Sequence, residues 1–341
     1  MLTDWAKSKV SRHYLSMRLL ISAIHRYPAL TEVGSGLEPK ALPSGSGSLV
    51  HDLMVRGLAE LGHQVFYLLP NGADQPLPDG VTMVSEPILD VDVLHTISDH
   101  DNDLVREWQA LGKPWVTTCH LDPRARGNKR APATENWIFV SRTLAQLYDS
   151  DRYVLNGIDP AEYIFSESKE NYVLFMSTMD WGMAKGLDVV LSLAGKQPFK
   201  VVVAGTGNDW ESVNRVAELC RKANALYVGD VRGKTKAKLL AGAKALLFPT
   251  KLNEAFGLGM VEALMSGTPV VCSDRGACPE IISPDVGFVC REQSDYVAAV
   301  NNIASISPQA CREKAMREYH YLRMAADYAV EYEREFARNG N

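Results

Sequence analysis

Short apolar runs alternate along the chain with longer segments in which apolar residues recur every three or four positions. The short runs predict buried strands, and the longer segments predict amphipathic helices. Because strand and helix keep alternating, we expect parallel sheets with helices on both faces, which is a doubly wound α/β fold. The strands are expected at residues 17–22, 64–69, 81–86, 91–97, 114–121, 136–140, 172–177, 199–207, 225–231, 245–249 and 268–273.

The clearest strand, helix and strand unit lies between residues 244 and 274 and contains two glutamates. Glu254 and Glu262 have seven residues between them, and Gly267 stands where a glycine commonly ends a helix. We expect Glu254 at the carboxyl end of a strand and Glu262 about two turns into the helix. Both carboxylates should then face the crevice where ligands of such folds bind.

The residues between the two glutamates read AFGLG, a segment suited to an anion. A helix start offers unpaired backbone N–H groups and the positive end of the helix dipole. Gly257 and Gly259 would let a ligand approach the backbone closely, because glycine has no side chain. The sequence therefore predicts a phosphate site between Glu254 and Glu262.

The segment NEAFGLGMVEALMSGTPVV resembles the E-x7-E stretch of the retaining, family 4-like glycosyltransferases, the large GT-B family with sucrose synthase and bacterial glycogen synthase. The resemblance implies two Rossmann-like domains facing a central cleft and a nucleoside diphosphate sugar as donor. In that family the first glutamate bonds hydroxyls of the donor sugar and the second holds the ribose, which implies these roles for Glu254 and Glu262. Two glutamates at this spacing also occur on solvated helix faces, but the surrounding motif favours the functional interpretation.

The diphosphate clamp of that family is only partly present in this chain. Lys185 matches the lysine of the family's K-G pair, whereas Thr178 stands where the family has an arginine. A leaving diphosphate needs positive charge as its bond breaks. We therefore expect Arg232 or Lys251 to supply the second cation, or the enzyme to be slow or inactive. The alternative interpretation of Lys185 is a solvent-exposed charge at a helix start, without a role in binding.

In the first half, a glycine-rich turn at residues 44–48 precedes a predicted helix and is interpreted either as a phosphate-approaching turn or as a flexible loop. The family carries a G-G pair here, and this chain reads Gly45, Ser46, Gly47. The segment TTCH resembles the family's T-x-H, whose histidine touches the donor sugar. This implies that role for His120, with His95 as second choice, although a lone histidine at a strand end is more often a core residue.

The resemblance implies two sets of site residues. The catalytic set is Glu254, Lys185 and His120. The donor-binding set is Gly45, Gly47, Thr178, Lys185, Val231, Arg232, Glu254, Ala255, Phe256, Gly257, Leu258 and Glu262. Neither a metal nor a resident cofactor is implied by the resemblance, because the helix amides with Lys185 replace the cation.

Residues 156–159 match the family's N-G-I-D at the crossover between domains. The expected organisation is an N-terminal extension (1–16), an acceptor domain (17–155), a donor domain (156–315) and a C-terminal helix that returns to the first domain (316–341). Four tyrosines near the chain end could form the buried side of that helix or be scattered surface aromatics. They are Tyr319, Tyr321, Tyr328 and Tyr332.

Composition narrows the class of protein. A chain of 341 residues is long enough for two domains, and 46% hydrophobic with 23% charged residues is typical of globular enzymes. The net charge of -5 argues against nucleic acid or an anionic membrane as partner. The six cysteines show no CxxC spacing, which indicates reduced thiols in a cytoplasmic protein without a zinc site. The extension leaves a peripheral membrane contact open, and the oligomeric state is not predicted.

The resulting hypothesis is a retaining, metal-independent transferase that moves a sugar from a nucleoside diphosphate sugar, expected to be a uridine one, to an unidentified acceptor. In a front-face mechanism the leaving phosphate would take the acceptor proton, so no dedicated base is needed. A catalytically weakened nucleotide-binding scaffold is one alternative, because the clamp arginine is missing. A transferase acting on nucleic acid is another, motivated by the basic segment at residues 122–132 with Arg124, Arg126, Lys129 and Arg130.

Overall fold

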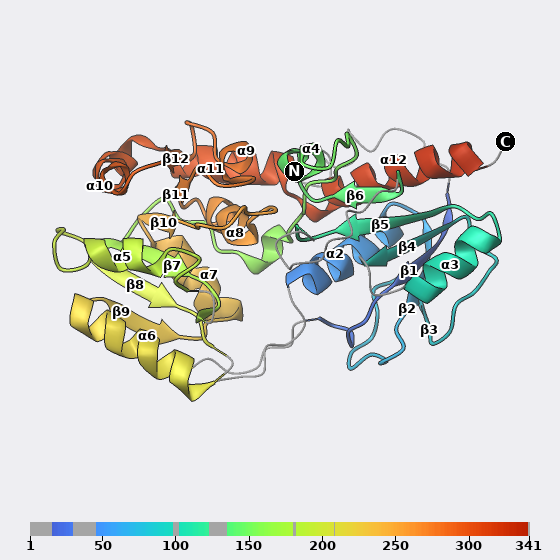
Figure 1. The fold of residues 1–341 in the computed structure, drawn as a ribbon, viewed down its shortest axis with the longest axis horizontal. Coiled ribbons are helices and arrows are strands. Elements are labelled where there is room, and N and C mark those ends of the chain that lie inside the picture. The colour runs from blue at the N-terminus through green and yellow to red at the C-terminus, as the bar shows by residue number, and fades with distance from the viewer. Residues whose placement is uncertain are drawn as a thin grey trace. The chain divides into compact units, whose positions relative to one another are not determined.

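The computed structural model describes residues 16–29, 46–97, 102–122, 135–179, 182–207 and 209–339. The described residues form two compact units, which divide after Ile158 and again after Arg317. The first unit holds the N-terminal part of the chain together with its last helix, and the second holds the residues from Asp159 to Arg317 (Figure 1).

The first unit contains one six-stranded sheet whose neighbouring strands all run parallel. Its strands are β1 (Arg18–Ser22), β2 (Gln64–Leu68), β3 (Val81–Val84), β4 (Val93–Ile97), β5 (Trp115–Cys119) and β6 (Trp137–Phe139). The order β3-β2-β1-β4-β5-β6 is that of a doubly wound nucleotide-binding fold. Every position of β4 and β5 is buried, including the polar residues His95 and Thr118, whereas edge strand β3 is partly exposed.

The helices of the first unit are α2 (Ser46–Glu60), α3 (Asn102–Ala110), α4 (Arg142–Gln146) and α12 (Tyr321–Asn339). Helix α12 packs along α2 and also contacts β4 and β5. Gly57 permits this close packing, because a Cβ there would lie 2.7 Å from the Cβ of Ala325. The four tyrosines that the sequence left as either core or surface are all buried: Tyr319, Tyr321, Tyr328 and Tyr332.

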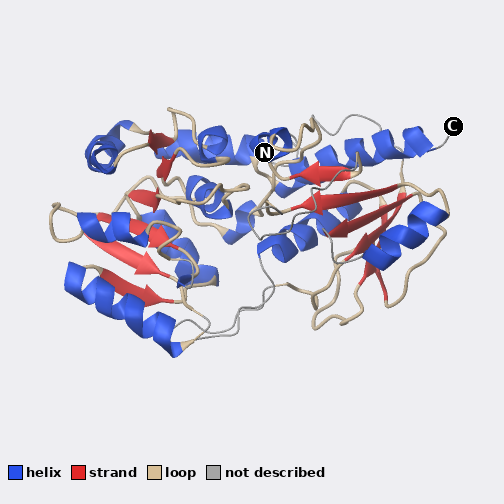
Figure 2. Ribbon diagram, in the orientation of Figure 1, coloured by secondary structure: helices blue, strands red, loops and turns tan. Residues whose placement is uncertain are grey.

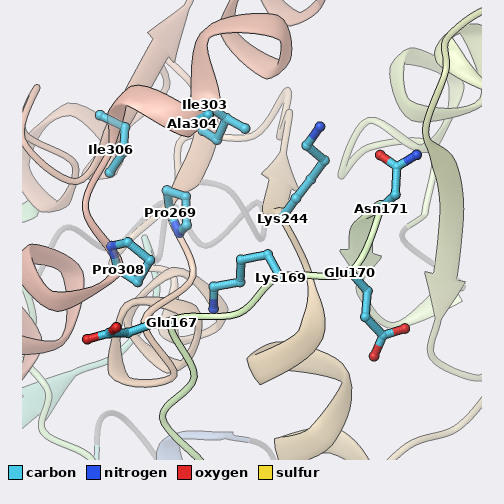
Figure 3. A pocket seen from close by; sticks show the side chains of 10 residues that line it. All are labelled: Glu167, Lys169, Glu170, Asn171, Lys244, Pro269, Ile303, Ala304, Ile306 and Pro308. Atoms are coloured by element: carbon cyan, nitrogen blue, oxygen red, sulfur yellow. The ribbon is translucent and has the colours of Figure 1, made fainter.

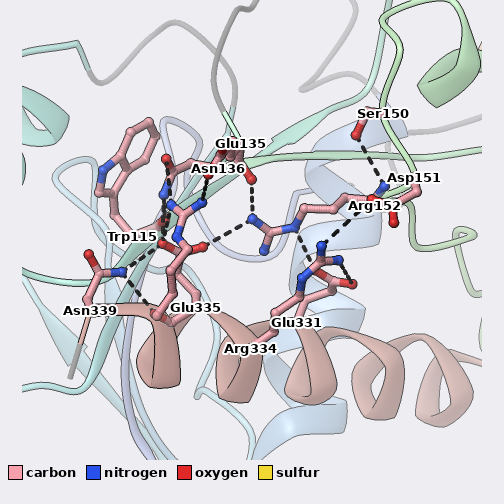
Figure 4. Close-up of polar contacts among 11 residues, drawn as sticks. Trp115, Glu135, Asn136, Ser150, Asp151, Arg152, Glu331, Arg334, Glu335 and Asn339 are labelled. Atoms are coloured by element: carbon pink, nitrogen blue, oxygen red, sulfur yellow. Dashed lines mark hydrogen bonds and ion pairs between the residues drawn. The ribbon is translucent and has the colours of Figure 1, made fainter. Parts of the chain in front are cut away.

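A buried ion pair ties α12 to the segments that flank β6 (Figure 4). Arg152 donates through Nε to Oε2 of Glu331 at 2.7 Å, and its Nη1 lies 3.1 Å from Oε2 of Glu335. Asn136 donates to Oε1 of Glu335 at 2.9 Å and to the carbonyl of Trp115 at 2.6 Å. Arg152 is 4% exposed and Glu335 only 1%, and each buried charge is compensated by more than one partner: Glu331 also pairs with Arg152, and Arg338 also pairs with Glu335.

The second unit contains a second six-stranded parallel sheet. Its strands are β7 (Tyr172–Met176), β8 (Lys200–Ala204), β9 (Leu226–Gly229), β10 (Ala245–Phe248), β11 (Val270–Ser273) and β12 (Gly287–Cys290). The order β12-β11-β10-β7-β8-β9 has the same connectivity as the first sheet, with its switch point between β7 and β10. The sequence did not predict β12, a four-residue strand at the end of the sheet that includes the exposed Val289.

Helices flank the strands of each unit (Figure 2). In the second unit the helical segments are η3 (Pro160–Glu162), α5 (Leu187–Leu193), α6 (Trp210–Ala223), α7 (Gly233–Gly242), α8 (Leu258–Met265), α9 (Cys278–Ile281), α10 (Gln293–Asn302), η5 (Ile303–Ser305) and α11 (Pro308–Glu318). Each strand expected from the sequence has a counterpart among the described residues. The six cysteines are buried and none forms a disulfide. No described helix combines the length and apolar character that a membrane span requires.

Candidate active site

The loops that follow β7 and β10 meet at the switch point of the second sheet. These two strands are neighbours in the sheet but are not consecutive in the chain. The loop after β7 leads to α5, and the loop after β10 leads to α8. In open α/β sheets this is the position where ligands bind, outside the carboxyl ends of the strands. Lys185 lies in the loop after β7, and Glu254 lies in the loop after β10.

Lys185 and Glu254 form an ion pair, with Nζ 2.5 Å from Oε2. Their side chains are 25% and 14% exposed, so both remain within reach of a ligand. The two loops fit closely: Lys251 donates its backbone N–H to the carbonyl of Ala184 at 2.9 Å. Gly186 has φ +88°, and a Cβ there would lie 2.0 Å from the carbonyl oxygen of Pro249. A glycine after Lys185 is therefore required for the pair to form.

A third loop, after β11, holds the backbone of Glu254. Ala277 donates its N–H to the carbonyl oxygen of Glu254 at 2.8 Å. Gly276 has φ +57°, and a Cβ there would lie 2.2 Å from that same oxygen. The position of Glu254 is thus set by loops from three adjacent strands.

Helix α8 begins directly after the loop that follows β10 and contains Glu254. Gly257 caps it with φ +92°, Ala255 and Phe256 are buried before it, and Leu258 is its first residue. The expectation that Glu262 lies about two turns into the helix is wrong, because the left-handed Gly257 starts the helix late. Glu262 is the fifth residue of α8, just over one turn from its start.

Glu262 is 6% exposed and bonds two residues that the sequence did not indicate. Its Oε1 accepts a hydrogen bond from the hydroxyl of Tyr163 at 3.0 Å and another from Nζ of Lys236 at 2.6 Å. A lone carboxylate in an apolar helix signals that partners must exist. Only the packing of η3 and α7 reveals which residues they are.

The other donor-side residues lie on loops at the same edge of the second sheet. Thr178 is half-buried after β7, and Val231 is buried after β9. Arg232 donates through Nε to Asp230 at 2.7 Å, and Lys251 donates to Asp188 at 2.6 Å. Both residues expected to replace the clamp arginine are therefore already paired with a carboxylate.

In the first unit, His120 follows β5 and lies against the first turn of α2. A Cβ on Gly47 would lie 3.2 Å from Cγ of His120, so this glycine makes room for the ring. The ring of His51 lies 5.6 Å from that of His120. Burial lowers the pKa of His120 to about 4, so the ring is neutral at physiological pH.

His95 is fully engaged inside the first unit. Its Nδ1 lies 2.6 Å from the hydroxyl of Tyr332, and its Nε2 lies 2.7 Å from Oγ1 of Thr118. Burial and then the charge of His120 lower its pKa to about 3. His95 is thus a core residue. Gly45 and the basic residues Arg124, Arg126, Lys129 and Arg130 lie outside the described residues, as do residues 1–15.

The opposite, amino-terminal edge of the second sheet carries a pocket of about 330 Å³ (Figure 3). Lys169 beside it donates to the carbonyl of Ala241 and to Oγ1 of Thr268, both at 2.9 Å, so it acts as a structural link. Burial lowers the pKa of Lys169 to about 8. Within the described part of the chain, no three His, Cys, Asp or Glu side chains gather as metal ligands.

The donor-side geometry can accept an anion beside Lys185 and the start of α8, and polar hydroxyls at the two glutamates. Residues 162–323 match the family model described as glycosyl transferases group 1. D-rhamnosyltransferase WbpZ of Pseudomonas aeruginosa is 27% identical over 202 residues, which are 51% of this chain and 52% of that protein. The chain thus spans about half the length of this curated relative.

Solved structures share the fold over nearly the whole chain. AviGT4, a glycosyltransferase involved in avilamycin A biosynthesis, superimposes with a TM-score of 0.70 at 23% identity and covers 94% of this chain and 98% of its own. Anabaena HepE in complex with UDP and glucose gives 0.69 at 14% identity and covers 93% and 100%. Together with the two parallel six-stranded sheets, this likeness confirms the predicted GT-B fold class.

Proposed function

Residues 162–323 belong to the glycosyl transferases group 1 family, and from this premise we propose that the protein transfers a sugar from a nucleoside diphosphate sugar to an acceptor with retention of configuration. The observation that carries the proposal is the ion pair of Lys185 and Glu254 at the switch point of the second sheet. A cation beside the start of α8 suits a diphosphate, and a carboxylate beside it suits sugar hydroxyls.

In the proposed mechanism, Lys185 exchanges its bond with Glu254 for one with the β-phosphate of the donor. The bond between the anomeric carbon and the phosphate oxygen breaks, and the electron pair stays on the phosphate. Lys185 and the first amides of α8 stabilise that charge. The acceptor oxygen attacks from the same face, and its proton passes to the leaving phosphate oxygen. Glu254 holds sugar hydroxyls, and Glu262 holds the ribose.

A uridine donor is the first to test, because HepE, which shares the fold, was solved with UDP and glucose. Thermal shift with UDP, GDP and ADP and their sugars gives the binding profile, since a ligand at a hundredfold its Kd adds about 2.7 kcal/mol of stability. Release of nucleoside diphosphate from the stabilising donor then measures turnover. Proteins with Glu254→Gln or Lys185→Met are the matched controls. Wild-type protein without any donor turnover would contradict the proposal.

A nucleotide-binding scaffold is the second candidate, favoured by Thr178 at the position of the clamp arginine. Stabilisation by a nucleoside diphosphate with no release of sugar from any donor would support it. A nucleic-acid acceptor is tested separately by binding at low and high salt, because phosphate contacts weaken steeply with salt.

A further inference from the structure

Glu262 is the single charged residue of α8, whose positions from Met260 to Met265 are all buried. An ionised carboxylate in such surroundings is costly unless partners compensate it. Tyr163 from η3 and Lys236 from α7 supply them, so the second sheet's edge contains a second lysine and glutamate pair beside that of Lys185 and Glu254.

Both partners bond the same oxygen of Glu262. The hydroxyl of Tyr163 and Nζ of Lys236 each donate to Oε1, at 3.0 and 2.6 Å. Among the described residues, Oε2 receives no hydrogen bond. Two donors on one oxygen fix the rotation of the carboxylate and leave the other oxygen as its acceptor for a ligand.

Lys236 is also held from a second direction. Its Nζ lies 6.0 Å from the ring centre of Tyr163, within the range of a cation–π contact. Burial, and then the carboxylate of Glu262, raise the pKa of Tyr163 well above its ordinary value, so its hydroxyl stays protonated and donates. The Lys236 side chain is 25% exposed, so it is not fully enclosed by the protein.

We propose that Lys236 and Tyr163 are positioning residues of the nucleotide site, which bind Oε1 of Glu262 so that Oε2 accepts the 2′ and 3′ hydroxyls of a ribonucleoside diphosphate. This inference rests on the proposed function. Lys236 has a second effect, because its charge offsets that of Glu262 one helical turn from the expected diphosphate. Without it, an isolated carboxylate would repel the anionic ligand.

The test measures Kd by isothermal titration calorimetry for UDP, GDP and ADP and for their 2′-deoxy analogues. Wild-type protein should prefer the ribonucleotide it binds. Lys236→Met should weaken ribonucleotide binding roughly tenfold, as expected for a lost hydrogen bond to a charged group, and reduce the ratio of deoxy to ribo Kd. Lys236→Arg should restore most of that ratio. Lys238→Met, at an exposed position of α7, is the matched control and should bind as wild type does.

Tyr163→Phe provides an independent test, because it removes one hydroxyl and keeps the packing; it too should lower the deoxy to ribo ratio. A Lys236→Met protein that folds and keeps the wild-type ratio would overturn the inference alone. Should Lys236→Met not fold, an unchanged ratio in Tyr163→Phe would overturn it instead. Wild-type protein that binds none of the six nucleotides would overturn the proposed function and this inference with it.

Discussion

Lys185 and Glu254 lie 69 positions apart in the chain, yet their charged groups are 2.5 Å from each other at the junction of two strands. The contact holds a cation beside the start of α8 before any anion arrives. A ligand that breaks this ion pair must therefore offer an anionic group to Lys185 and a hydrogen-bond donor to Glu254. The variants below separate these effects.

Lys185→Met should lower turnover by roughly a hundredfold or more, because one preorganised charge at the leaving group is lost. Steady-state release of nucleoside diphosphate from the donor is the measurement. Lys196→Met, at an exposed position of the same unit, is the control. Normal turnover in Lys185→Met would mean that a cation other than Lys185 stabilises the leaving diphosphate.

Glu254→Ala and Glu262→Ala should fail in different ways. A contact near the anomeric carbon strengthens as charge develops there, so Glu254→Ala should mainly reduce kcat. A ribose contact is equal in ground and transition state, so Glu262→Ala should mainly raise the Kd of the nucleotide. Calorimetry and kinetics on both variants check this. Equal losses of affinity with intact turnover would exclude the assigned roles.

Gly186→Ala should destabilise the protein by about 1–3 kcal/mol and lower turnover, because it adds a clash to a left-handed backbone. The added Cβ would lie 2.0 Å from the carbonyl oxygen of Pro249. Gly195→Ala is a matched control with φ +69° and no atom closer than 3.5 Å, so it isolates backbone strain from the clash. Chemical denaturation and turnover measure both variants. Equal losses of stability and turnover in Gly186→Ala and Gly195→Ala would contradict the prediction, because the loop around Gly186 would then accommodate the added Cβ by a small shift.

Glu335→Ala should destabilise the first unit by about 1–3 kcal/mol, since it leaves Glu331 as the one side-chain carboxylate described beside the buried Arg152 and takes an acceptor from Asn136. Urea denaturation followed by circular dichroism is the measurement. Glu333→Ala, on a half-buried position of α12, should cost much less. An unchanged midpoint in Glu335→Ala would contradict this prediction and mean that Glu331 alone compensates Arg152.

Stability should fall as the pH drops from about 6.5 toward 4. Burial lowers the pKa of His51 well below 6.5, that of His95 to about 3 and that of His120 to about 4. Unfolded chains therefore bind protons in this window while the folded protein does not, and each histidine adds a slope of up to about 1.4 kcal/mol per pH unit. His120→Asn should reduce the slope in denaturation curves. A slope that is the same in both proteins would contradict the burial of this ring.

Every strand except β12 could be predicted from the sequence, because short apolar runs such as those of β7 and β10 are a local pattern. The exact start of α8 could not be predicted, because the left-handed conformation of Gly257 depends on the structure around it. The partners of Glu262 could not be predicted, because Tyr163 is 99 positions away and Lys236 is one of three lysines on α7. Which of them meets the carboxylate depends on how two helices pack, and no periodicity records that packing.

The return of α12 to the first unit has a consequence for synthesis on the ribosome. Tyr332 bonds His95, and Tyr328 bonds Thr118, so the interior of the first unit includes side chains translated after the whole second unit. Residues 159–317 follow one another without interruption and are complete once they emerge. The N-terminal half, although made first, must wait for the last helix before β4 and β5 are covered, and in that interval its apolar surface is open to chaperones.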